Sequence, residues 1–111
     1  MDRIASYREI IKQLIHHHAQ LSKQETGIEQ ELIFDNEHEH YQLLYVGWDG
    51  MRRVYSVGLH LDIKDGKIWL QHNAFEADIA AELVARGVPK NDIVLGFFAP
   101  YRRKLSEYAA V

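Results

Sequence analysis

The segment DNEHEHY at residues 35–41 combines histidines with acidic residues, the side chains that most often bind divalent cations. His38 and His40, with a neighbouring carboxylate, could therefore form a metal site. The flanking runs ELIF and YQLLYVGW are typical of strands, which places residues 36–39 at the tip of a hairpin. A solvated tip supplies few outer partners that would orient metal ligands. A polar loop is the simpler interpretation, and we predict no metal ligands in this chain.

A second run of histidines, His16, His17 and His18, lies in a segment with helical spacing. Consecutive residues of an α-helix point about 100° apart, so these three side chains cannot converge on one ion. His18 falls on the apolar side of the predicted helix, and we expect it to be partly buried.

His60 and Asp62 lie two residues apart in a predicted strand, so they share one face of the sheet. Trp69 and Gln71 lie opposite them, which brings an acid, a base and an aromatic group together. Ser56 shares the face but lies about 13 Å from His60 at the usual strand rise, too far for a nucleophile–base pair. Without a nucleophile or a pocket we predict no catalytic residue, no cofactor and no enzyme. The second alternative function is that of a hydrolase, which would use either His60 and Asp62 or the hairpin-tip histidines with a metal ion.

Basic residues gather at Arg52-Arg53 and at Arg102-Arg103-Lys104, and Tyr101 beside the second group could stack on a nucleic-acid base. The formal net charge is −3 with neutral histidines, whereas a stand-alone DNA-binding protein usually needs a basic face. Short basic clusters on an acidic protein more often mark a solvated surface or an acidic partner. Direct DNA binding through Arg52, Arg53, Arg102, Arg103 and Lys104 is therefore kept as an alternative function.

The elements that position these residues belong to a chain of 111 residues, a length that predicts one domain over residues 1–111. Its 47% of apolar residues is typical of a globular protein. The absence of cysteine excludes disulfides and a cysteine nucleophile. No apolar stretch approaches the roughly 20 residues that span a bilayer, and the N-terminus lacks the apolar core of a signal peptide. We expect a cytoplasmic protein without membrane contacts.

Apolar residues recur at helical spacing near the N-terminus and predict a long amphipathic helix over about residues 2 to 23, which Gly27 ends. The stripe consists of Ile4, Tyr7, Ile11, Leu14, Ile15, His18 and Leu21. A second helix is predicted after Asn73, because Asn73 and Glu76 have the spacing of a capping box. Its inner stripe is Ile79, Ala80, Leu83 and Val84, and it ends with Gly87 at the C′ position and Pro89 beyond.

Two Asp-Gly pairs predict the turns of an antiparallel meander, because type I′ turns favour this dipeptide. A turn at Asp65-Gly66 pairs Ile63 with Ile68, Leu61 with Leu70, Leu59 with His72, Asp62 with Trp69 and His60 with Gln71. A turn at Asp49-Gly50 pairs Trp48 with Met51, Val46 with Arg53 and Leu44 with Tyr55. The two registers agree on one apolar face: Leu44, Val46, Tyr55, Val57, Leu59, Leu61, Ile63, Ile68 and Leu70.

The opposite face of this predicted sheet carries Tyr41, Leu43, Tyr45, Val54 and Trp69, mixed with Ser56, Gly58, His60 and Asp62. It is too apolar for a face that contacts only water. Either a later segment of the chain covers it, or it binds a protein partner or a second copy of the chain.

The expected fold class is α+β: a long N-terminal helix, an antiparallel meander of about four strands, a second helix, a short buried C-terminal strand within DIVLGFF and a basic tail. Two helices against one sheet face suit a chain of this size.

Three stretches, VGWDGMRRVY, DGKIWLQ and IAAELVARGVPKNDIVLGF, make the chain resemble the XisI family, the fdxN element excision controlling factors of cyanobacteria. The resemblance extends over nearly the whole length. One departure precedes the second helix, where the family pattern D-x-T-E is replaced by Asn73, Ala74, Phe75 and Glu76.

The resemblance implies an accessory role in excising a DNA element during heterocyst differentiation, together with a XisH-type protein and a site-specific recombinase. It supplies no catalytic residues. We therefore predict a non-enzymatic factor that acts by protein contact, with a homodimer as a further possible assembly. The predicted partner-binding surface comprises Leu43, Tyr45, Val54, Trp69, Tyr101, Arg102 and Arg103.

Overall fold

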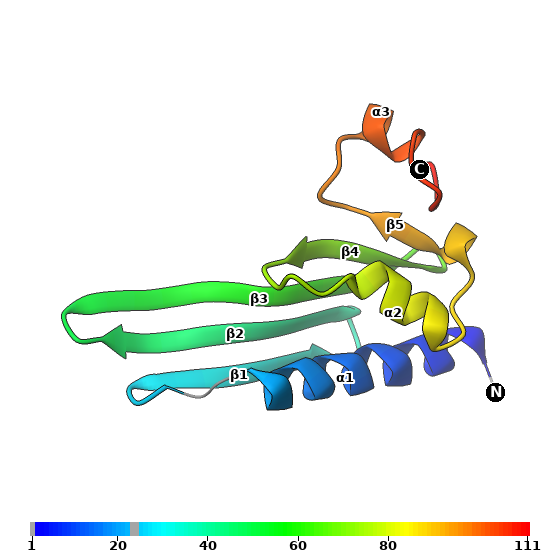
Figure 1. Cartoon of the computed structure of the whole chain (residues 1–111). Helices are drawn as coiled ribbons and strands as arrows, with labels where there is room; N and C mark the ends of the chain where they lie inside the picture. The colour runs from blue at the N-terminus through cyan, green and yellow to red at the C-terminus, as the bar shows by residue number, and fades with distance from the viewer. Residues whose placement is uncertain (1, 23–24) are drawn as a thin grey trace.

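The structure is a computed structural model that describes residues 2–22 and 25–111. One sheet has the strand order β1-β2-β3-β4-β5, in which β1 to β4 form an antiparallel meander and β5 runs parallel to β4 (Figure 1). The predicted α+β class is confirmed. The elements are α1 (Arg3–Leu21), β1 (Ile28–Asp35), β2 (His40–Asp49), β3 (Arg52–Lys64), β4 (Lys67–Asn73), α2 (Ile79–Ala85), the 3-10 helix η1 (Lys90–Asp92), β5 (Ile93–Leu95) and α3 (Pro100–Arg103).

Helix α1 forms where the apolar periodicity predicts it. Its N-cap is Asp2, whose side chain accepts a hydrogen bond from the Ile4 backbone N–H and so satisfies one of the free donors of the first turn. The predicted end near residue 23 lies outside the described residues, within which the helix ends at Leu21. The buried residues of the helix are Tyr7, Ile11, Leu14, Ile15, His18 and Ala19.

The turn at Asp65-Gly66 confirms its prediction. Both residues have positive φ, 54° and 76°, as a type I′ turn requires. The pairs Ile63–Ile68, Leu61–Leu70 and Asp62–Trp69 are those expected. Further along, one extra residue in β4, Gln71, shifts the register. His60 therefore pairs with His72 and Leu59 with Asn73, so the predicted pairs His60–Gln71 and Leu59–His72 were wrong.

The register predicted for the first turn is wrong by two residues. Asp49 pairs with Arg52, so the central residues are Gly50 and Met51. Gly50 has φ of 60° and occupies the first central position, the arrangement of a type II′ turn. Val46 consequently pairs with Tyr55, and Leu44 pairs with Val57.

A β-bulge at Gly58 overturns the predicted division of the sheet into faces. Leu43 pairs with Leu59 and Leu44 with Val57, which leaves Gly58 as the extra residue of β3. Because side chains alternate along a strand, one extra residue exchanges the two faces beyond it. A Cβ at position 58 would lie 2.7 Å from the Tyr45 ring and 3.2 Å from the Phe75 ring, so only glycine fits there.

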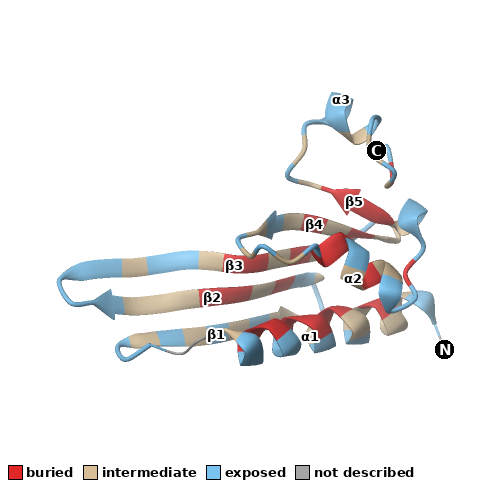
Figure 2. Ribbon diagram, viewed as in Figure 1, coloured by how far each residue is buried: buried red, intermediate tan, exposed pale blue. Residues whose placement is uncertain are grey.

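The core lies between one sheet face and helices α1 and α2, where Figure 2 shows the buried segments gathered. Tyr41 and Leu43, predicted to lie on the opposite face, are fully buried in it. Leu44, Val46, Tyr55 and Val57 lie on the other face, called the back face below. The strand residues of the core are Tyr41, Leu43, Leu59, Leu61, Ile63, Ile68, Leu70, Ile93 and Leu95.

Helix α2 begins later than predicted, because Asp78 and not Asn73 is its N-cap. The Asp78 side chain accepts from the Ala81 backbone N–H. Asn73 instead closes a local turn, in which its Oδ1 accepts from the Phe75 N–H and its Nδ2 donates to the Ala77 carbonyl. The apolar stripe is confirmed, with Ile79, Ala80 and Leu83 buried and Val84 packed against the core. Gly87, at φ of 104°, follows the C-cap Arg86, as predicted.

The C-terminal segment, residues 96–111, packs at the β4–β5 end of the sheet. Its contacts include a hydrogen bond from the Ala109 N–H to the Ile93 carbonyl and one from Arg103 Nε to the Leu95 carbonyl. Val94, which lies beside Trp69, is fully buried. Part of the back face is thus covered by the chain itself. Among the described residues, no helix is both long and apolar enough to cross a membrane.

Candidate functional site

The residues of the predicted partner-binding surface do not share a face. Leu43 is 0% exposed and belongs to the core. Tyr45 also lies on the helix side, where its hydroxyl donates to Ser22 Oγ over 2.8 Å. Trp69 lies on the back face between two cations, with Lys64 Nζ 4.7 Å and Arg103 Cζ 5.0 Å from its ring centroid. The prediction of one continuous surface was therefore wrong, and the bulge at Gly58 is the reason.

Of the C-terminal residues in that prediction, Tyr101 and Arg102 are exposed and Arg103 is used internally. Arg103 donates from Nη1 to the Val111 carbonyl over 2.8 Å and from Nη2 to the Gly96 carbonyl over 3.4 Å. The Arg102 guanidinium lies 4.2 Å from the Phe98 ring centroid. Arg103 thus holds the C-terminal segment together. Val54, the remaining residue of the predicted surface, is half-buried and lies far along the sheet in β3.

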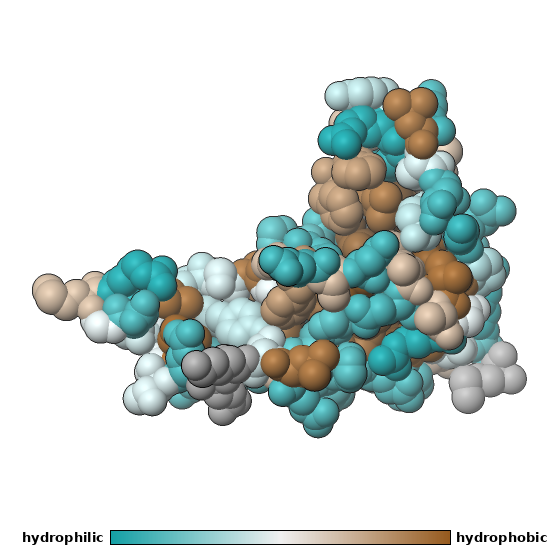
Figure 3. All heavy atoms as spheres, in the orientation of Figure 1, coloured by the Kyte–Doolittle hydropathy of each residue, from teal (hydrophilic) through white to brown (hydrophobic). Residues whose placement is uncertain are grey.

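The sequence analysis did not predict an exposed apolar feature at the β2–β3 turn. Residues 46–57, called the hairpin arm below, form the distal part of β2, the turn and the start of β3, and they project past the end of α1 (Figures 1 and 3). Met51 is 99% exposed, Tyr55 69% and Trp48 53%. Without the bulge at Gly58, the prediction had assigned Val46 and Tyr55 to the helix-covered face. In the sequence, an apolar tip of this hairpin is indicated by Met51, which directly follows the Asp49-Gly50 pair.

The two basic clusters lie at different ends of the molecule (Figure 1). Arg52 and Arg53 belong to the hairpin arm, and Arg102 to Lys104 belong to α3 and its C-cap. Arg52 Nη2 pairs with Asp49 Oδ2 at 3.2 Å, and the Arg53 guanidinium lies 5.5 Å from the Trp48 ring centroid. The two clusters do not form one basic face.

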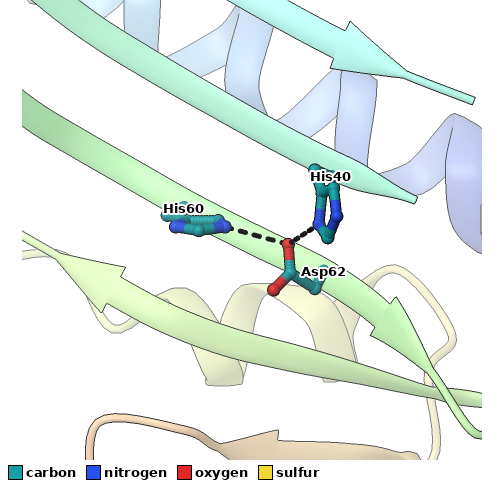
Figure 4. A group of neighbouring side chains, drawn as sticks. All are labelled: His40, His60 and Asp62. Atoms are coloured by element: carbon teal, nitrogen blue, oxygen red, sulfur yellow. Dashed lines mark hydrogen bonds and ion pairs between the residues drawn. The ribbon is translucent and has the colours of Figure 1, made fainter. Parts of the chain in front are cut away.

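Two candidate motifs that the sequence keeps apart meet on the back face. His40, from DNEHEHY, pairs across the strands with Asp62, and His60 lies on the same side (Figure 4). His40 Nδ1 is 2.8 Å and His60 Nε2 2.9 Å from the same atom, Asp62 Oδ1. Gln71 Nε2 donates to the other carboxylate oxygen, Oδ2, over 3.1 Å. We call His40, His60 and Asp62 the His-Asp cluster.

The environment keeps Asp62 ionised. Its side chain is only 15% exposed, and burial by itself raises the pKa of the carboxyl group. Hydrogen bonds from His40, His60 and Gln71 favour the carboxylate and outweigh burial, so the pKa of Asp62 is lowered overall. A carboxylate and two imidazoles therefore face one another at the surface of a rigid sheet.

The rest of DNEHEHY joins the first hairpin to α1. Glu39, at φ of 66°, accepts from Arg8 Nε over 2.8 Å and from the Tyr41 hydroxyl over 3.0 Å. Burial, followed by the hydrogen bond to Glu39, raises the pKa of Tyr41. His38 Nδ1 lies 2.9 Å from Oδ2 of Asp35, the last residue of β1. The prediction of a polar hairpin tip at residues 36–39 is confirmed, because these residues form the turn between β1 and β2, and His40 lies outside it.

The three consecutive histidines have different environments, although the rings of His17 and His18 lie 5.3 Å apart, edge to face. His18 is buried, lies 2.8 Å from Glu82 Oε1 through Nε2, and stacks on Phe75 with ring centroids 5.6 Å apart. His16 contacts the edge of Phe34, and His17 is exposed. His18 therefore joins α1 to α2. Phe75, which replaces the threonine of the D-x-T-E pattern, supplies part of the packing between these helices and the bulge.

The fold and this site define a small α+β protein with a helix-covered sheet, a projecting hairpin and a surface His-Asp cluster. The protein family described as XisI protein matches residues 1–110. A XisI-like protein from Anabaena variabilis ATCC 29413 has a crystal structure that is 44% identical, with a TM-score of 0.93 over 99% of this chain and 100% of that one. The fdxN element excision controlling factor XisI from the same organism is 35% identical, with a TM-score of 0.89 and the same coverage. Comparison with curated proteins gives no significant match. The chain belongs to the XisI family, as the resemblance predicted.

Proposed function

We propose that this chain is a controlling factor for excision of a DNA element, and that it works by protein contact and not by catalysis. The likeness over the whole chain to the fdxN element excision controlling factor XisI supports the process. The hairpin arm supports the mode of action, and it is the single observation on which the contact surface rests. The expected partner is a XisH-type protein, with a site-specific recombinase as the enzyme that cuts the DNA.

The arm has the composition of a recognition element. Trp48, Tyr55 and Arg53 are of the residue types that dominate binding energy at protein interfaces. All three lie on the back face of the arm, since Trp48 pairs with Arg53 and Val46 pairs with Tyr55. Met51 at the tip adds a flexible apolar side chain, of the kind that adapts to a partner surface. Burying these side chains stabilises a complex without any rearrangement of the core.

Binding should be tested by purifying the chain together with a XisH-type protein. The double variant Trp48→Glu/Tyr55→Glu places charges in the proposed contact, and we expect at least about tenfold weaker binding. The matched control is Leu105→Glu, because Leu105 is 84% exposed but belongs to the C-terminal segment. Binding that the arm variant leaves unchanged, or that Leu105→Glu weakens equally, would remove the arm as the contact surface.

Direct DNA binding receives less support from the arrangement of charges. Arg103 is used in three hydrogen bonds to backbone carbonyls, and the arginines of the arm lie at another end of the molecule. Binding through phosphate contacts requires affinity that falls steeply with salt. A gel-shift titration at two salt concentrations separates the two functions, since a steep salt dependence would favour DNA and a flat response favours protein contact.

A further inference from the structure

We propose that His40, His60 and Asp62 form a binding site for a divalent transition metal of borderline softness, with Zn²⁺ as the reference ion. Two imidazole nitrogens and one carboxylate oxygen are a donor set that such ions prefer, whereas Mg²⁺ and Ca²⁺ prefer oxygen ligands. Three protein ligands leave a fourth position, which water fills. The inference does not depend on the proposed role in DNA excision.

The three donor atoms are already gathered in the absence of an ion. His40 Nδ1, His60 Nε2 and one carboxylate oxygen of Asp62 all lie within 4.8 Å of one another. A tetrahedral ion with bonds of about 2.0 Å holds its ligand atoms roughly 3.3 Å apart. The carboxylate oxygen lies slightly closer than this to each histidine, at 2.8 and 2.9 Å, whereas the widest separation in the set, up to 4.8 Å, must shorten. His40, 58% exposed at its side chain, is free to rotate and complete the set.

Outer contacts orient two of the three ligands. Gln71 Nε2 donates to Asp62 Oδ2 and leaves Oδ1 directed at the histidines. Gln42 Nε2 lies 3.3 Å from His60 Nδ1, the ring nitrogen away from the proposed ion. When Nε2 binds metal, Nδ1 carries the proton, and a turn of the Gln42 amide presents its oxygen as the acceptor. Metal-binding histidines commonly have such a partner on the second nitrogen.

The bulges of the sheet create this arrangement. The extra residue Gly58 places His60 and Asp62 on the same face as His40, and Gln71, the extra residue of β4, donates to Asp62. Strands β2 and β3 hold the ligands, so the site has the rigid support that a loop lacks. His38 offers the contrast, since it lies in an exposed turn and pairs with Asp35, the last residue of β1.

The competing account is a hydrogen-bonded triad that binds no ion and serves only to join β2 to β3. Both accounts share the same contacts, so stability measurements alone do not separate them. The decisive difference is whether one metal ion displaces the protons between Asp62 and the two imidazoles.

The experiment is a calorimetric titration of Zn²⁺ into tag-free, chelator-treated full-length protein. We expect one ion per chain. Loss of an outer partner typically costs about 10–100-fold in metal affinity. Each of His40→Gln, His60→Gln and Asp62→Asn should therefore weaken binding at least tenfold. The control variants are His38→Gln and the double variant His16→Gln/His17→Gln, whose affinity should equal that of the unchanged protein.

Imidazole nitrogen NMR signals provide the second readout in the same titration. The signals of His40 and His60 should shift together with Zn²⁺, with the other histidines unaffected. The proposal would be overturned in favour of the triad by saturation without these shifts, or by His40→Gln and His60→Gln variants that bind Zn²⁺ as tightly as the unchanged protein. Loss of binding in a control variant, or absence of one-to-one binding, would overturn it equally.

Discussion

Residues 59–63 and residues 52–57 belong to the same strand, β3, but the two regions serve different purposes. The first region alternates buried core residues with the His-Asp cluster, beneath α1 and α2 (Figure 2). The second extends beyond the helices and exposes Tyr55 on the back face and Arg52 and Arg53 near the tip. Gly58 lies between them and reverses which side chains face the helices. One strand can therefore contribute to a core and to a recognition surface when a single inserted residue separates the two parts.

The largest expected effect is a difference in the free energy of unfolding between variants in the two regions of β3. Leu61→Ala should lower the free energy of unfolding by about 2–5 kcal/mol, because it leaves a cavity in the fully buried core. Tyr55→Ala on the arm should change it by no more than about 0.5 kcal/mol, as exposed substitutions generally do. Denaturant unfolding of both variants measures the difference. Equal losses would show that the arm is part of the folding core.

A smaller loss of stability is expected for a substitution at Gly58, the boundary between the two regions of β3. Gly58→Ala should cost about 1–3 kcal/mol, because the added Cβ meets the Tyr45 ring at 2.7 Å and forces it or the strand to move. Ser56→Ala, two residues away and exposed, is the matched control. A stable Gly58→Ala variant with unchanged contacts around Tyr45 would contradict the role assigned to the bulge. The unfolding midpoint and a tyrosine-resolved NMR spectrum together provide the test.

How much the sequence reveals is illustrated by its two Asp-Gly pairs. Asp65-Gly66 adopts the positive φ at both residues that the dipeptide favours, so its turn and nearest pairs were predicted correctly. At Asp49-Gly50 the glycine occupies the first central position of the turn and not the second position, which was predicted from the sequence. This arrangement is a type II′ turn, which needs glycine only at its first central position. The dipeptide alone does not distinguish these outcomes.

The His-Asp cluster depends on the β-bulge at Gly58, which the spacing of apolar residues along the chain does not reveal. Without the bulge, strand alternation places His40 on the same face as Leu44 and Val46, opposite His60 and Asp62. The bulge at Gly58 follows from the packing of Tyr45 and Phe75, which are distant in sequence. Helix α1, the stripe of α2, the buried β5 and the family were visible in the sequence because they depend on local spacing and on motifs.

A third prediction concerns the anchoring of α1 in the body. The Tyr7 hydroxyl donates to Asp92 Oδ2, and burial, together with this hydrogen bond, raises the pKa of Tyr7 to about 12. Tyr7→Phe should cost about 1–2 kcal/mol at neutral pH, the contribution of a hydrogen bond to a charged group after partial compensation. Arg3 and Lys67 remain near Asp92 and limit the loss. Chemical denaturation at pH 7 measures it, and an unchanged midpoint would contradict the assignment.

The smallest expected effect is the pH dependence of the same contact. A folded-state pKa above the unfolded value, about 10, means that the stabilisation is complete below pH 10 and is lost as the pH rises towards 12. The stability of the unchanged protein should therefore fall more steeply over this interval than that of Tyr7→Phe. Parallel slopes in the two proteins would show that Tyr7 ionises as freely when folded as when unfolded.

The most direct test of the central claim is hydrogen–deuterium exchange of the chain with and without the proposed XisH-type partner. The account predicts that slower exchange on complex formation is concentrated in residues 46–57, with the backbone of residues 59–63 unchanged because it is already protected in the sheet. Protection confined to the C-terminal segment, or none on the arm in a complex shown to form, would contradict the division of β3 into a core and a recognition surface.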